Sequence, residues 1–489
     1  MKSSQSLLFG ALAWATASCS LDMSRYSAGH RQDSPACREP PEGPAHLTID
    51  VFQKHQTLVG FGAAVAYYAD WLTSFPSDSP INDAAFRDLG LDILRLRDKF
   101  DRQDFRASSD ITTEVTVLAR ATQSLGRVPK ILLSSWSPPA NLKASGLEYC
   151  TNTDQAAKSG CTLAKTAGQF VYDQFAQHFV QSLDYYAASG IVPDYLSIQN
   201  EPNYVPNGWE GCFFLPTEDS NYPGYDQALS AVRTALTSMS NAPKLLGPEV
   251  NNLNNSALDM YVTDSTRSSY DVLAHHLYSG NSWSAPDSYL MQMADATAAA
   301  ADLPLFQTEF DTQGDGGTGG GFETAWVMHN ALAVEGVQAF LYWSLVWAGP
   351  STQTPSNSMI WISEGNYTLR DQYYAMRHFA RYTDPGYTRV DVTSSQSDVR
   401  ASAYLAPDSS QLTLVMLNVG SCDAPVTTDS IAGFSAAHTE AYQSTFNTDD
   451  AGPSERWKQL DGFDINQPFT LPSHSVLTVV LNSGDVDAS

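Results

Sequence analysis

Short apolar runs alternate with longer amphipathic stretches between about residue 55 and residue 385. This alternation is typical of repeated βα units, whose strands pair in parallel. Eight runs can be counted, and each is expected to form a strand: residues 57–62, 93–97, 130–134, 195–199, 244–247, 272–276, 305–308 and 339–343. Eight parallel strands match a closed (β/α)8 barrel with loop insertions, and an open doubly wound sheet is the structural alternative.

Polar and aromatic side chains gather at the ends of these runs. They are Arg95 and Arg97, Trp136, Asn200 and Glu201, Glu249, His276 and Tyr278, Glu309, and Trp343. Barrel enzymes carry their active sites at the C-terminal ends of the strands, so this placement favours the barrel. A doubly wound nucleotide-binding sheet would need a glycine-rich turn after its first strand, and Gly60-Phe61-Gly62 lacks the third glycine of that motif.

The pattern changes from about residue 386 to strict alternation of apolar and polar positions, as in 412–417 and 475–481. Such alternation predicts antiparallel strands with one buried face. Residues 45–54 show the same alternation ahead of the first barrel run. We therefore expect a catalytic barrel over 55–385 and a small antiparallel β-sandwich domain over 386–489, docked at its side, which the strand or strands at 45–54 join.

The first residues have the pattern of an export signal. Lys2 precedes the apolar run 7–14, and Ala15-Thr16-Ala17 forms an A-x-A cleavage site. We expect a signal peptide over 1–17, an N-terminal extension over 18–44, and a secreted, extracellular protein; a buried helix is the alternative for the apolar run. Asn254 and Asn366 begin N-x-S/T sequons, which a secreted chain can use for glycosylation.

Charge narrows the set of partners. The chain has 489 residues, and its 53 Asp and Glu oppose 27 Lys and Arg, which gives a net charge of -26. Nucleic-acid phosphates and anionic lipids would repel so acidic a surface. We therefore expect a neutral or weakly charged partner, no nucleic-acid or membrane partner, and a monomer.

Six cysteines fit an oxidising compartment. Cys150 and Cys161 bracket a loop short enough to close as a disulfide, and two free thiols are the alternative. Spacing leaves the partners of four further cysteines open: Cys19, Cys37, Cys212 and Cys422. The sequence contains no C-x-x-C pair that would indicate zinc binding or thiol redox chemistry.

Two carboxylates carry the chemical prediction. Glu201 and Glu309 each follow an apolar run directly, so each is expected at the C-terminal end of a strand. Cleavage of a glycosidic bond needs one carboxylic acid to protonate the leaving oxygen and one carboxylate to attack the anomeric carbon or activate water. Asn200 is well suited to hydrogen-bond the sugar 2-hydroxyl. A solvated loop carboxylate is the alternative for either Glu alone, but the pair favours a glycosidase.

These residues resemble the clan A glycoside hydrolases, and family 30 most closely. The resemblance begins with Asn200-Glu201-Pro202 after the fourth run and Glu309 at the end of the seventh. Further motifs extend it nearly end to end: 60–62 (GFG), 94–97 (LRLR), 135–139 (SWSPP), 373–376 (YYAM), 381–382 (RY) and 385–387 (PGY). The resemblance implies a barrel with a side-docked β domain built from both termini. It also implies a retaining mechanism with Glu201 as acid/base and Glu309 as nucleophile, their carboxyl groups about 5 to 5.5 Å apart.

Further site residues follow from the ends of the strands. His276 and Tyr278 match the H-x-Y pattern that the resembled enzymes place after strand six, where the Tyr hydroxyl contacts the nucleophile. Arg95 is expected to hold Glu309 ionised, and an ion pair without a catalytic part is the alternative. His275 is expected to point away from His276, because strand neighbours face opposite sides. No metal and no other cofactor is therefore expected.

Aromatic residues are expected to bind the sugar rings. A pyranose has an apolar CH face, and an indole at a strand end offers a flat surface for it. Trp136 and Trp343 are the candidate platforms, the latter because 341–344 (LYWS) resembles the strand-eight motif of the clan. Tyr204 and Trp209 follow Glu201 as further candidates, and core packing is the alternative for each ring.

The sequence therefore predicts a secreted, retaining, endo-acting glycoside hydrolase that cleaves β-linked plant or fungal cell-wall polysaccharide. β-1,4-Xylan is favoured, as for an endoxylanase or glucuronoxylanase. β-1,6-Glucan and β-1,6-galactan are alternatives for the same site, and a carbohydrate-binding protein without activity is the non-enzymatic one. The loop 63–71 contains no base to anchor a glucuronate branch, and Arg370 is a remaining candidate. Dependence on glucuronate and endo against exo action stay open.

Overall fold

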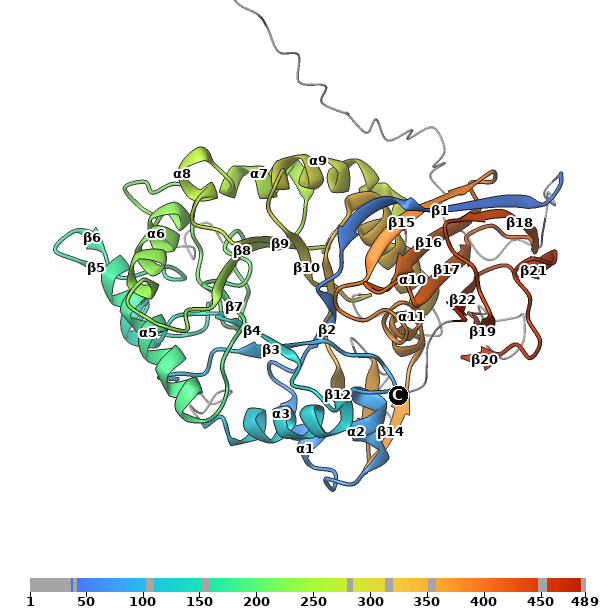
Figure 1. The fold of residues 1–489 in the computed structure, drawn as a ribbon. Helices are drawn as coiled ribbons and strands as arrows, with labels where there is room; N and C mark the ends of the chain where they lie inside the picture. Colours follow the sequence, from blue (N-terminus) through green and yellow to red (C-terminus); the bar gives the residue numbers. More distant parts are fainter. Residues whose placement is uncertain are drawn as a thin grey trace, which may run out of the picture.

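Eight parallel strands close into a barrel in the computed structural model (Figure 1). The structure describes residues 37, 42–102, 110–151, 159–278, 285–312, 320–350, 358–446 and 455–484. The barrel strands, in order around the ring, are β2 (Gly60–Ala64), β3 (Ile93–Arg97), β4 (Lys130–Ser134), β7 (Tyr195–Ser197), β8 (Lys244–Val250), β9 (Val272–His276), β10 (Leu305–Glu309) and β11 (Ala339–Tyr342). β11 pairs in parallel with β2 and closes the ring. The prediction of a (β/α)8 barrel over a doubly wound sheet is confirmed.

The first barrel strand begins later than its apolar run suggests. Thr57 belongs to β1 (Ala45–Thr57), which lies outside the barrel, and β2 starts at Gly60. Gly60 has a φ of 133°, and a Cβ there would lie 2.4 Å from the Cβ of Asp92. Only glycine adopts this backbone without strain, so the chain turns here from one domain into the other.

Helices surround the barrel wherever the chain returns between strands (Figure 1). They are α1 (Ala69–Thr73), α2 (Pro80–Ala85), α3 (Thr112–Leu125), α5 (Tyr172–Ala188), α6 (Tyr225–Leu236), α7 (Ala257–Tyr261), α8 (Asp264–Arg267), α9 (Leu290–Ala300), α10 (Gly321–His329) and α11 (Asp371–Ala380). In α5 the buried side chains include Phe175, Phe179, Leu183 and Tyr186, whose spacing forms one helical face against the strands. Among the described residues, no helix combines the length and apolar character that crossing a membrane requires.

Short elements extend the loops at the C-terminal ends of the barrel strands. A three-stranded sheet of β12 (Val346–Ala348), β13 (Ile360–Ser363) and β14 (Asn366–Leu369) follows the last barrel strand. β5 (Lys165–Thr166) pairs with β6 (Gln169–Phe170) ahead of α5, and the short helices η2 (Ala140–Leu142), η3 (Asn254–Ser256), η4 (Pro286–Tyr289) and η5 (Asn330–Glu335) lie in the remaining connections.

A nine-stranded sheet forms the second domain, at the side of the barrel (Figure 1). Its order is β20 (Lys458–Gln459), β19 (His438–Thr445), β22 (Ser475–Asn482), β17 (Gln411–Asn418), β16 (Val399–Leu405), β15 (Thr388–Ser394), β1, β18 (Ala424–Ala432) and β21 (Phe469–Leu471). The side-docked antiparallel β domain with an N-terminal strand is confirmed, with one exception. β1 pairs in parallel with β18, because it enters from the other end of the chain rather than through a hairpin.

Successive side chains of the central strands point to opposite faces of the sheet and pack into two different hydrophobic cores. On β17, Leu412, Leu414 and Met416 join the core of the β domain, whereas Val415 and Leu417 pack in the core that includes the barrel helices. Both faces of the sheet are therefore buried at its centre, which holds the two domains together.

Polar groups are also buried where the two domains meet. Arg400 on β16 pairs with Asp287 of η4 through hydrogen bonds of 2.7 and 2.6 Å. His378 on α11 contacts the hydroxyls of Thr478 at 2.8 Å and Ser444 at 2.7 Å, on β22 and β19. These side chains fix the orientation of the β domain against the barrel, since each buried polar group needs its partner across the interface.

Disulfides join distant and near parts of the chain. Cys150–Cys161 is present as predicted, and Cys37 pairs with Cys422. Cys212 is a buried free thiol, and Cys19 lies outside the described residues, as do the expected signal peptide and most of the N-terminal extension. The exact domain boundaries and the expected monomer stay predictions.

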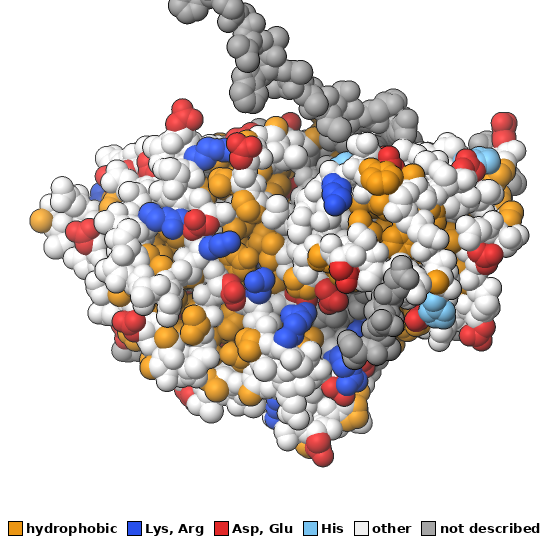
Figure 2. All heavy atoms as spheres, in the orientation of Figure 1, with side chains coloured by type: hydrophobic (Ala, Val, Ile, Leu, Met, Phe, Trp, Pro, Cys, Tyr) orange, Lys and Arg blue, Asp and Glu red, His pale blue; other side chains and the backbone are white. Residues whose placement is uncertain are grey.

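Figure 2 shows several Lys and Arg side chains in a row across one face of the molecule, with Asp and Glu side chains beside them. The expected neutral partner stays a prediction.

Candidate active site

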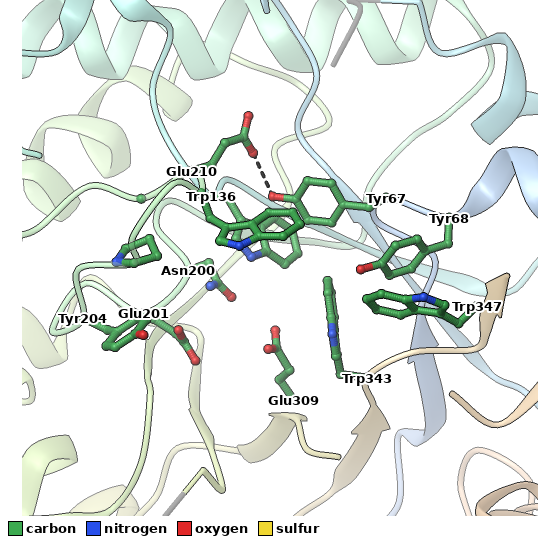
Figure 3. A pocket seen from close by; sticks show the side chains of 13 residues that line it. Tyr67, Tyr68, Trp136, Asn200, Glu201, Tyr204, Glu210, Glu309, Trp343 and Trp347 are labelled. Atoms are coloured by element: carbon green, nitrogen blue, oxygen red, sulfur yellow. Dashed lines mark hydrogen bonds between the residues drawn. The ribbon is translucent and has the colours of Figure 1, made fainter. Parts of the chain in front are cut away.

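A pocket of about 230 Å³ opens at the C-terminal ends of the barrel strands. Its lining consists of three carboxylates, one amide and a ring of aromatic side chains: Tyr67, Tyr68, Trp136, Asn200, Glu201, Tyr204, Pro206, Trp209, Glu210, Gly211, Glu309, Trp343 and Trp347. Figure 3 shows Glu201 and Glu309 directed into the pocket, with Trp343 beside Glu309. The residues predicted to carry the chemistry therefore converge in one cavity.

Glu201 and Glu309 lie close enough to act on one bond. One carboxylate oxygen of each and one ring nitrogen of His276 all lie within 4.8 Å of one another. Retaining glycosidases separate their carboxyl groups by about 5 to 5.5 Å, whereas inverting enzymes leave about 6.5 to 9.5 Å for a water molecule. The pair in this pocket has the shorter spacing.

The backbone holds Glu201 in an unusual conformation. The residue has a φ of 49°, in the left-handed region, just beyond the end of β7. Its N–H donates to the carbonyl of Glu249 at 3.0 Å, and the N–H of Asn200 donates to the carbonyl of Ser135 at 2.7 Å. A left-handed residue other than glycine costs on the order of 1 kcal/mol, so the neighbouring strands impose this position. Glu249, with a φ of 54°, is strained in the same way.

Arg95 on β3 lies beneath the pocket and connects its polar groups. It forms an ion pair with Glu309, donates to the amide oxygen of Asn200 at 2.6 Å, and lies 3.2 Å from Glu249. Its Nε donates to the Ser134 hydroxyl at 3.1 Å. Because Arg95 is fully buried, the structure places it against the carboxylates and not on the pocket wall.

His276 on β9 is also fully buried and reaches three carboxylates. Its Nδ1 lies 3.0 Å from Glu201, and its Nε2 lies 3.8 Å from Glu249 and 4.0 Å from Glu309. Burial by itself would lower the pKa of His276, but the charges of Glu309, Glu201 and Glu249 outweigh burial and raise this pKa to about 9. His276 is therefore an imidazolium at neutral pH.

Arg95 and His276 change the pKa values of the neighbouring carboxyl groups. Burial would raise the pKa of Glu249, but Arg95 and His276 lower it to about 2, so this group stays ionised. Burial raises the pKa of the Glu309 carboxyl against the lowering effect of His276 and Arg95, and the nearby charge of Glu201 raises it further. Tyr278 hydrogen-bonds Glu309, the contact that the family resemblance implies.

An amide completes the surroundings of Glu201. Asn251, just after β8, donates from its Nδ2 to Glu201 at 2.7 Å. The sequence analysis missed this residue, although its position directly after a barrel strand was a usable signal.

Aromatic rings form one wall of the pocket. The predicted Trp136 and Trp343 lie 5.7 Å apart between ring centroids, and Tyr67 stands edge-on to both at 5.6 and 6.1 Å. Tyr68 continues the wall and contacts Trp347 of β12 at 4.3 Å. The sequence analysis did not select Tyr67, Tyr68 or Trp347, because a Tyr or Trp in a loop is as common in a core as in a site.

A buried ion pair supports this aromatic wall. Glu210 accepts a hydrogen bond from the Tyr67 hydroxyl at 2.8 Å (Figure 3). It also pairs with Arg97, whose guanidinium lies 4.4 Å from the Tyr67 ring centre. Both oxygens of Glu210 thus have partners. Sequence reasoning named Arg97 only as a strand end and missed Glu210.

The Cys150–Cys161 disulfide braces the loop that carries Tyr204, Trp209 and Glu210. Cys150 donates its N–H to the carbonyl of Trp209 at 2.8 Å and accepts the N–H of Gly208 at 2.7 Å. Tyr204 and Trp209 are about half exposed at the pocket mouth. The disulfide therefore fixes part of the pocket wall.

Other predicted positions lie away from the pocket. Asn366 on β14 is exposed and Asn254 in η3 is half-buried, and their glycosylation stays a prediction. Arg370 precedes α11 and donates to the carbonyl of Ser358 at 3.2 Å. It does not belong to the pocket lining among the described residues.

The two adjacent histidines face opposite sides, as expected. His275 lies 2.5 Å from Glu335 of η5, away from the pocket. The structure nevertheless reveals a grouping that spacing did not show, since Glu201, His276 and Glu309 are close enough to share a metal ion. The expectation of no metal stays a prediction.

Comparison with known proteins supplies the class. The chain matches no protein-family model. It is 23% identical over 366 residues to the glucuronoxylanase XynC of Bacillus subtilis, which covers 73% of this chain and 75% of that protein. It is 25% identical over 431 residues to the endo-1,6-beta-D-glucanase neg1 of Aspergillus fumigatus, which covers 78% and 83% of the two chains.

Solved structures agree with these relatives. The glycoside hydrolase family 30 subfamily 8 xylanase Xyn30A of Clostridium acetobutylicum superposes with a TM-score of 0.66 at 21% identity, over 90% of this chain and all (100%) of that one. The catalytic domain of the family 30 xylanase C of Talaromyces cellulolyticus gives a TM-score of 0.68 at 17% identity, with the same coverage of 90% and 100%.

The relatives are named as a glucuronoxylanase and an endo-1,6-beta-D-glucanase, and the solved structures share the barrel of this chain, so fold and relatives agree with the predicted class, a barrel glycoside hydrolase. The glycoside hydrolase family 30 structures among these share the fold of this chain, which agrees with the resemblance that the sequence motifs carry.

Proposed function

We propose that this protein is a retaining, endo-acting β-glycanase in which Glu309 is the nucleophile and Glu201 the acid/base. The observation that carries the proposal is the separation of at most 4.8 Å between their nearest oxygens. That spacing is shorter than the roughly 6.5 to 9.5 Å that inverting enzymes leave between their carboxyl groups for a water molecule. The half-exposed Tyr204 and Trp209 at the pocket mouth support binding of further sugar units beyond the cleaved bond.

The proposed reaction has two displacements. Glu201 protonates the oxygen of the leaving sugar while a Glu309 oxygen attacks the anomeric carbon, which forms a glycosyl ester and releases the first product. Glu201, now a carboxylate, takes a proton from water as the water attacks the ester, and Glu309 is released. Asn200, held by Arg95, is placed to hydrogen-bond the 2-hydroxyl, and Trp343 and Trp136 to cover the sugar face.

We propose β-1,4-xylan as the substrate, with a neutral backbone at the cleaved bond. Among the described residues, the pocket lining contains three carboxylates and neither Lys nor Arg, so an acidic branch would find no free cation there. The relative from Bacillus subtilis is a glucuronoxylanase, which supports the xylan backbone. β-1,6-Glucan is the second candidate, because the Aspergillus fumigatus glucanase is equally similar to this chain.

Reducing-sugar release from a panel of polymers tests the proposal. The panel contains linear β-1,4-xylan, glucuronoxylan, β-1,6-glucan and β-1,6-galactan. Wild type is expected to act on both xylans, and Glu309→Gln to lose at least about 10³-fold in kcat. Glu335→Gln is the matched control, since it removes a buried carboxylate on the far side of β9. Equal release by wild type and Glu309→Gln would refute the assignment of the nucleophile.

Product stereochemistry tests the mechanism separately. NMR of the first product should show the β anomer, and an α anomer would exclude a retaining reaction. A rapid fall in xylan viscosity ahead of sugar release would support endo action, whereas a parallel course would contradict it.

Secretion is proposed alongside the activity. Two disulfides, Cys37–Cys422 and Cys150–Cys161, indicate an oxidising compartment and thus an extracellular type of protein. N-terminal sequencing of protein from the culture medium is expected to begin just after residue 17, and recovery only from cell lysates would contradict export.

A further inference from the structure

The cluster beneath the pocket contains a third carboxylate that the proposed mechanism does not use. Glu249 on β8 is fully buried and is not among the pocket-lining residues. Its side chain lies 3.2 Å from Arg95 and 3.8 Å from His276, and the Ser134 hydroxyl donates to it at 3.3 Å. Its main-chain carbonyl accepts the N–H of Glu201 at 3.0 Å. Glu249 therefore contacts both buried cations and the backbone of the proposed acid/base.

Charge balance in this cluster is unusual. Arg95 of β3 and His276 of β9 are its cations, and both also contact the pocket carboxylates: Arg95 pairs with Glu309, and His276 lies 3.0 Å from Glu201. Three carboxylates thus share two cations. Tyr225 of α6 also faces Glu249, and its phenol is kept neutral because burial and the charge of Glu249 both raise its pKa. Beside the pocket pair lie Tyr278 and Tyr68, whose pKa values are raised by burial and by the charges of Asp311 and Glu309, so both phenols are neutral as well.

We propose that Glu249 is a positioning residue that keeps one proton on the Glu201–Glu309 pair. Ionised Glu249 balances one of the two cationic charges, so the other balances only one of the two pocket carboxylates. An unbalanced negative charge in a buried cluster is unfavourable, and the second pocket carboxylate therefore holds a proton. One ionised and one protonated carboxyl group is the starting state of retaining hydrolysis, so this inference rests on the proposed function.

Opposite shifts in the pH–rate profile test the role. Glu249→Gln removes the charge and keeps the shape, so two cations face two carboxylates and both ionise more easily. The alkaline limb of kcat/KM is expected to move to lower pH by about one unit, with kcat reduced more than KM is changed. His276→Asn removes a cation and is expected to move the same limb to higher pH. The double variant should fall between the two.

The control is Glu335→Gln, which breaks another fully buried carboxylate–histidine pair, with His275 at 2.5 Å. Its alkaline limb should coincide with that of wild type, even if its melting temperature falls. Profiles are measured on β-1,4-xylan, or on β-1,6-glucan if that is the polymer cleaved, and thermal melts confirm folding of each variant.

The outcomes separate cleanly. Coincident alkaline limbs in wild type and Glu249→Gln, or shifts of the same sign in Glu249→Gln and His276→Asn, overturn the inference. If Glu249→Gln does not fold, the double variant decides: a limb below that of His276→Asn supports the role, and an equal limb overturns it. A wild type inactive on every polymer would instead refute the proposed function.

Discussion

Two fully buried histidines, His276 in the active site and His378 at the domain interface, are held in opposite charge states. His276 faces carboxylates, which raise its pKa to about 9. His378 faces the hydroxyls of Thr478 and Ser444; burial, with a smaller effect of Arg377, lowers its pKa to about 3. Equal burial thus gives opposite charges, because the partners decide which form of the ring is satisfied.

The two hydroxyls at the domain interface can hydrogen-bond both ring nitrogens of His378 when this histidine is neutral. Thr478 donates its own hydrogen to the His378 carbonyl at 2.8 Å, so its oxygen is left to accept from Nδ1–H. Ser444 already accepts the N–H of Trp457 at 2.9 Å, so its hydroxyl donates to Nε2. The active site has no such neutral arrangement, since carboxylates offer only acceptors. The active site therefore uses a charged histidine, whereas the domain interface uses a neutral one.

The largest expected effect is a loss of stability at acid pH, caused by protonation of His378 at the domain interface. The unfolded chain takes up a proton at His378 below pH 6.5, whereas the folded protein resists until about pH 3. Stability is thus lost as pH falls through this window, by up to about 5 kcal/mol for this group at one pKa unit per 1.36 kcal/mol. Chemical denaturation of wild type and His378→Asn at several pH values measures the loss, and the gap between them should close toward acid pH. Parallel curves would show that His378 is not neutral in the fold.

Alkaline pH is expected instead to remove the stabilisation that protonated His276 contributes to the fold. His276 keeps its proton in the folded protein up to about pH 9, whereas the unfolded chain loses it above pH 6.5. Its stabilisation is complete below pH 6.5 and is lost as pH rises through 9, a difference of about 3 kcal/mol. The same denaturation series with His276→Asn should differ from wild type less and less across this window. A constant difference would contradict a charged His276.

Activity should separate the two histidines. His276→Asn removes the cation that contacts Glu201 and is expected to reduce kcat on the order of 10²-fold. His378→Asn should leave kcat within about twofold, because its contacts lie on α11, β19 and β22 away from the pocket. Steady-state kinetics at one pH below 7 makes the comparison. Equal losses of kcat in the two variants would mean that the domain interface is coupled to the pocket.

The smallest expected effect comes from a single hydroxyl. Ser444→Ala leaves Nε2 of His378 without its donor and is expected to cost about 1 kcal/mol of unfolding free energy, with kcat unchanged. Thr478→Ala is the paired variant, since it removes the contact to Nδ1. Loss of activity without loss of stability in either variant would contradict a purely structural role of the domain interface.

Much of the barrel could be predicted because its strands are apolar runs of the right length. The predicted run 93–97 is β3 (Ile93–Arg97), and the run 272–276 is β9 (Val272–His276). Glu201 and Glu309 were predicted from the same pattern, since a parallel barrel brings the ends of its strands together.

The rest of the site depends on contacts that only closure of the barrel creates. Tyr67, Glu210 and Trp347 come from three segments far apart in sequence and line the same pocket as Trp136 and Trp343. Their residue types carry no local signal. The charge state of His276 was equally hidden, because it arises from carboxylates on three other strands or loops.

The path of the chain through β1 has a consequence for modularity. β1 is an interior strand of the β domain's sheet, between β15 and β18, and Cys37, which precedes it in the chain, is bonded to Cys422. The second domain is thus assembled from both ends of the polypeptide, with the entire barrel inserted between them. The β domain is therefore not a separable module of the chain. Cutting the chain after the barrel would leave β1 without either neighbour, so exchange of this domain between relatives requires two crossovers, one on each side of the barrel.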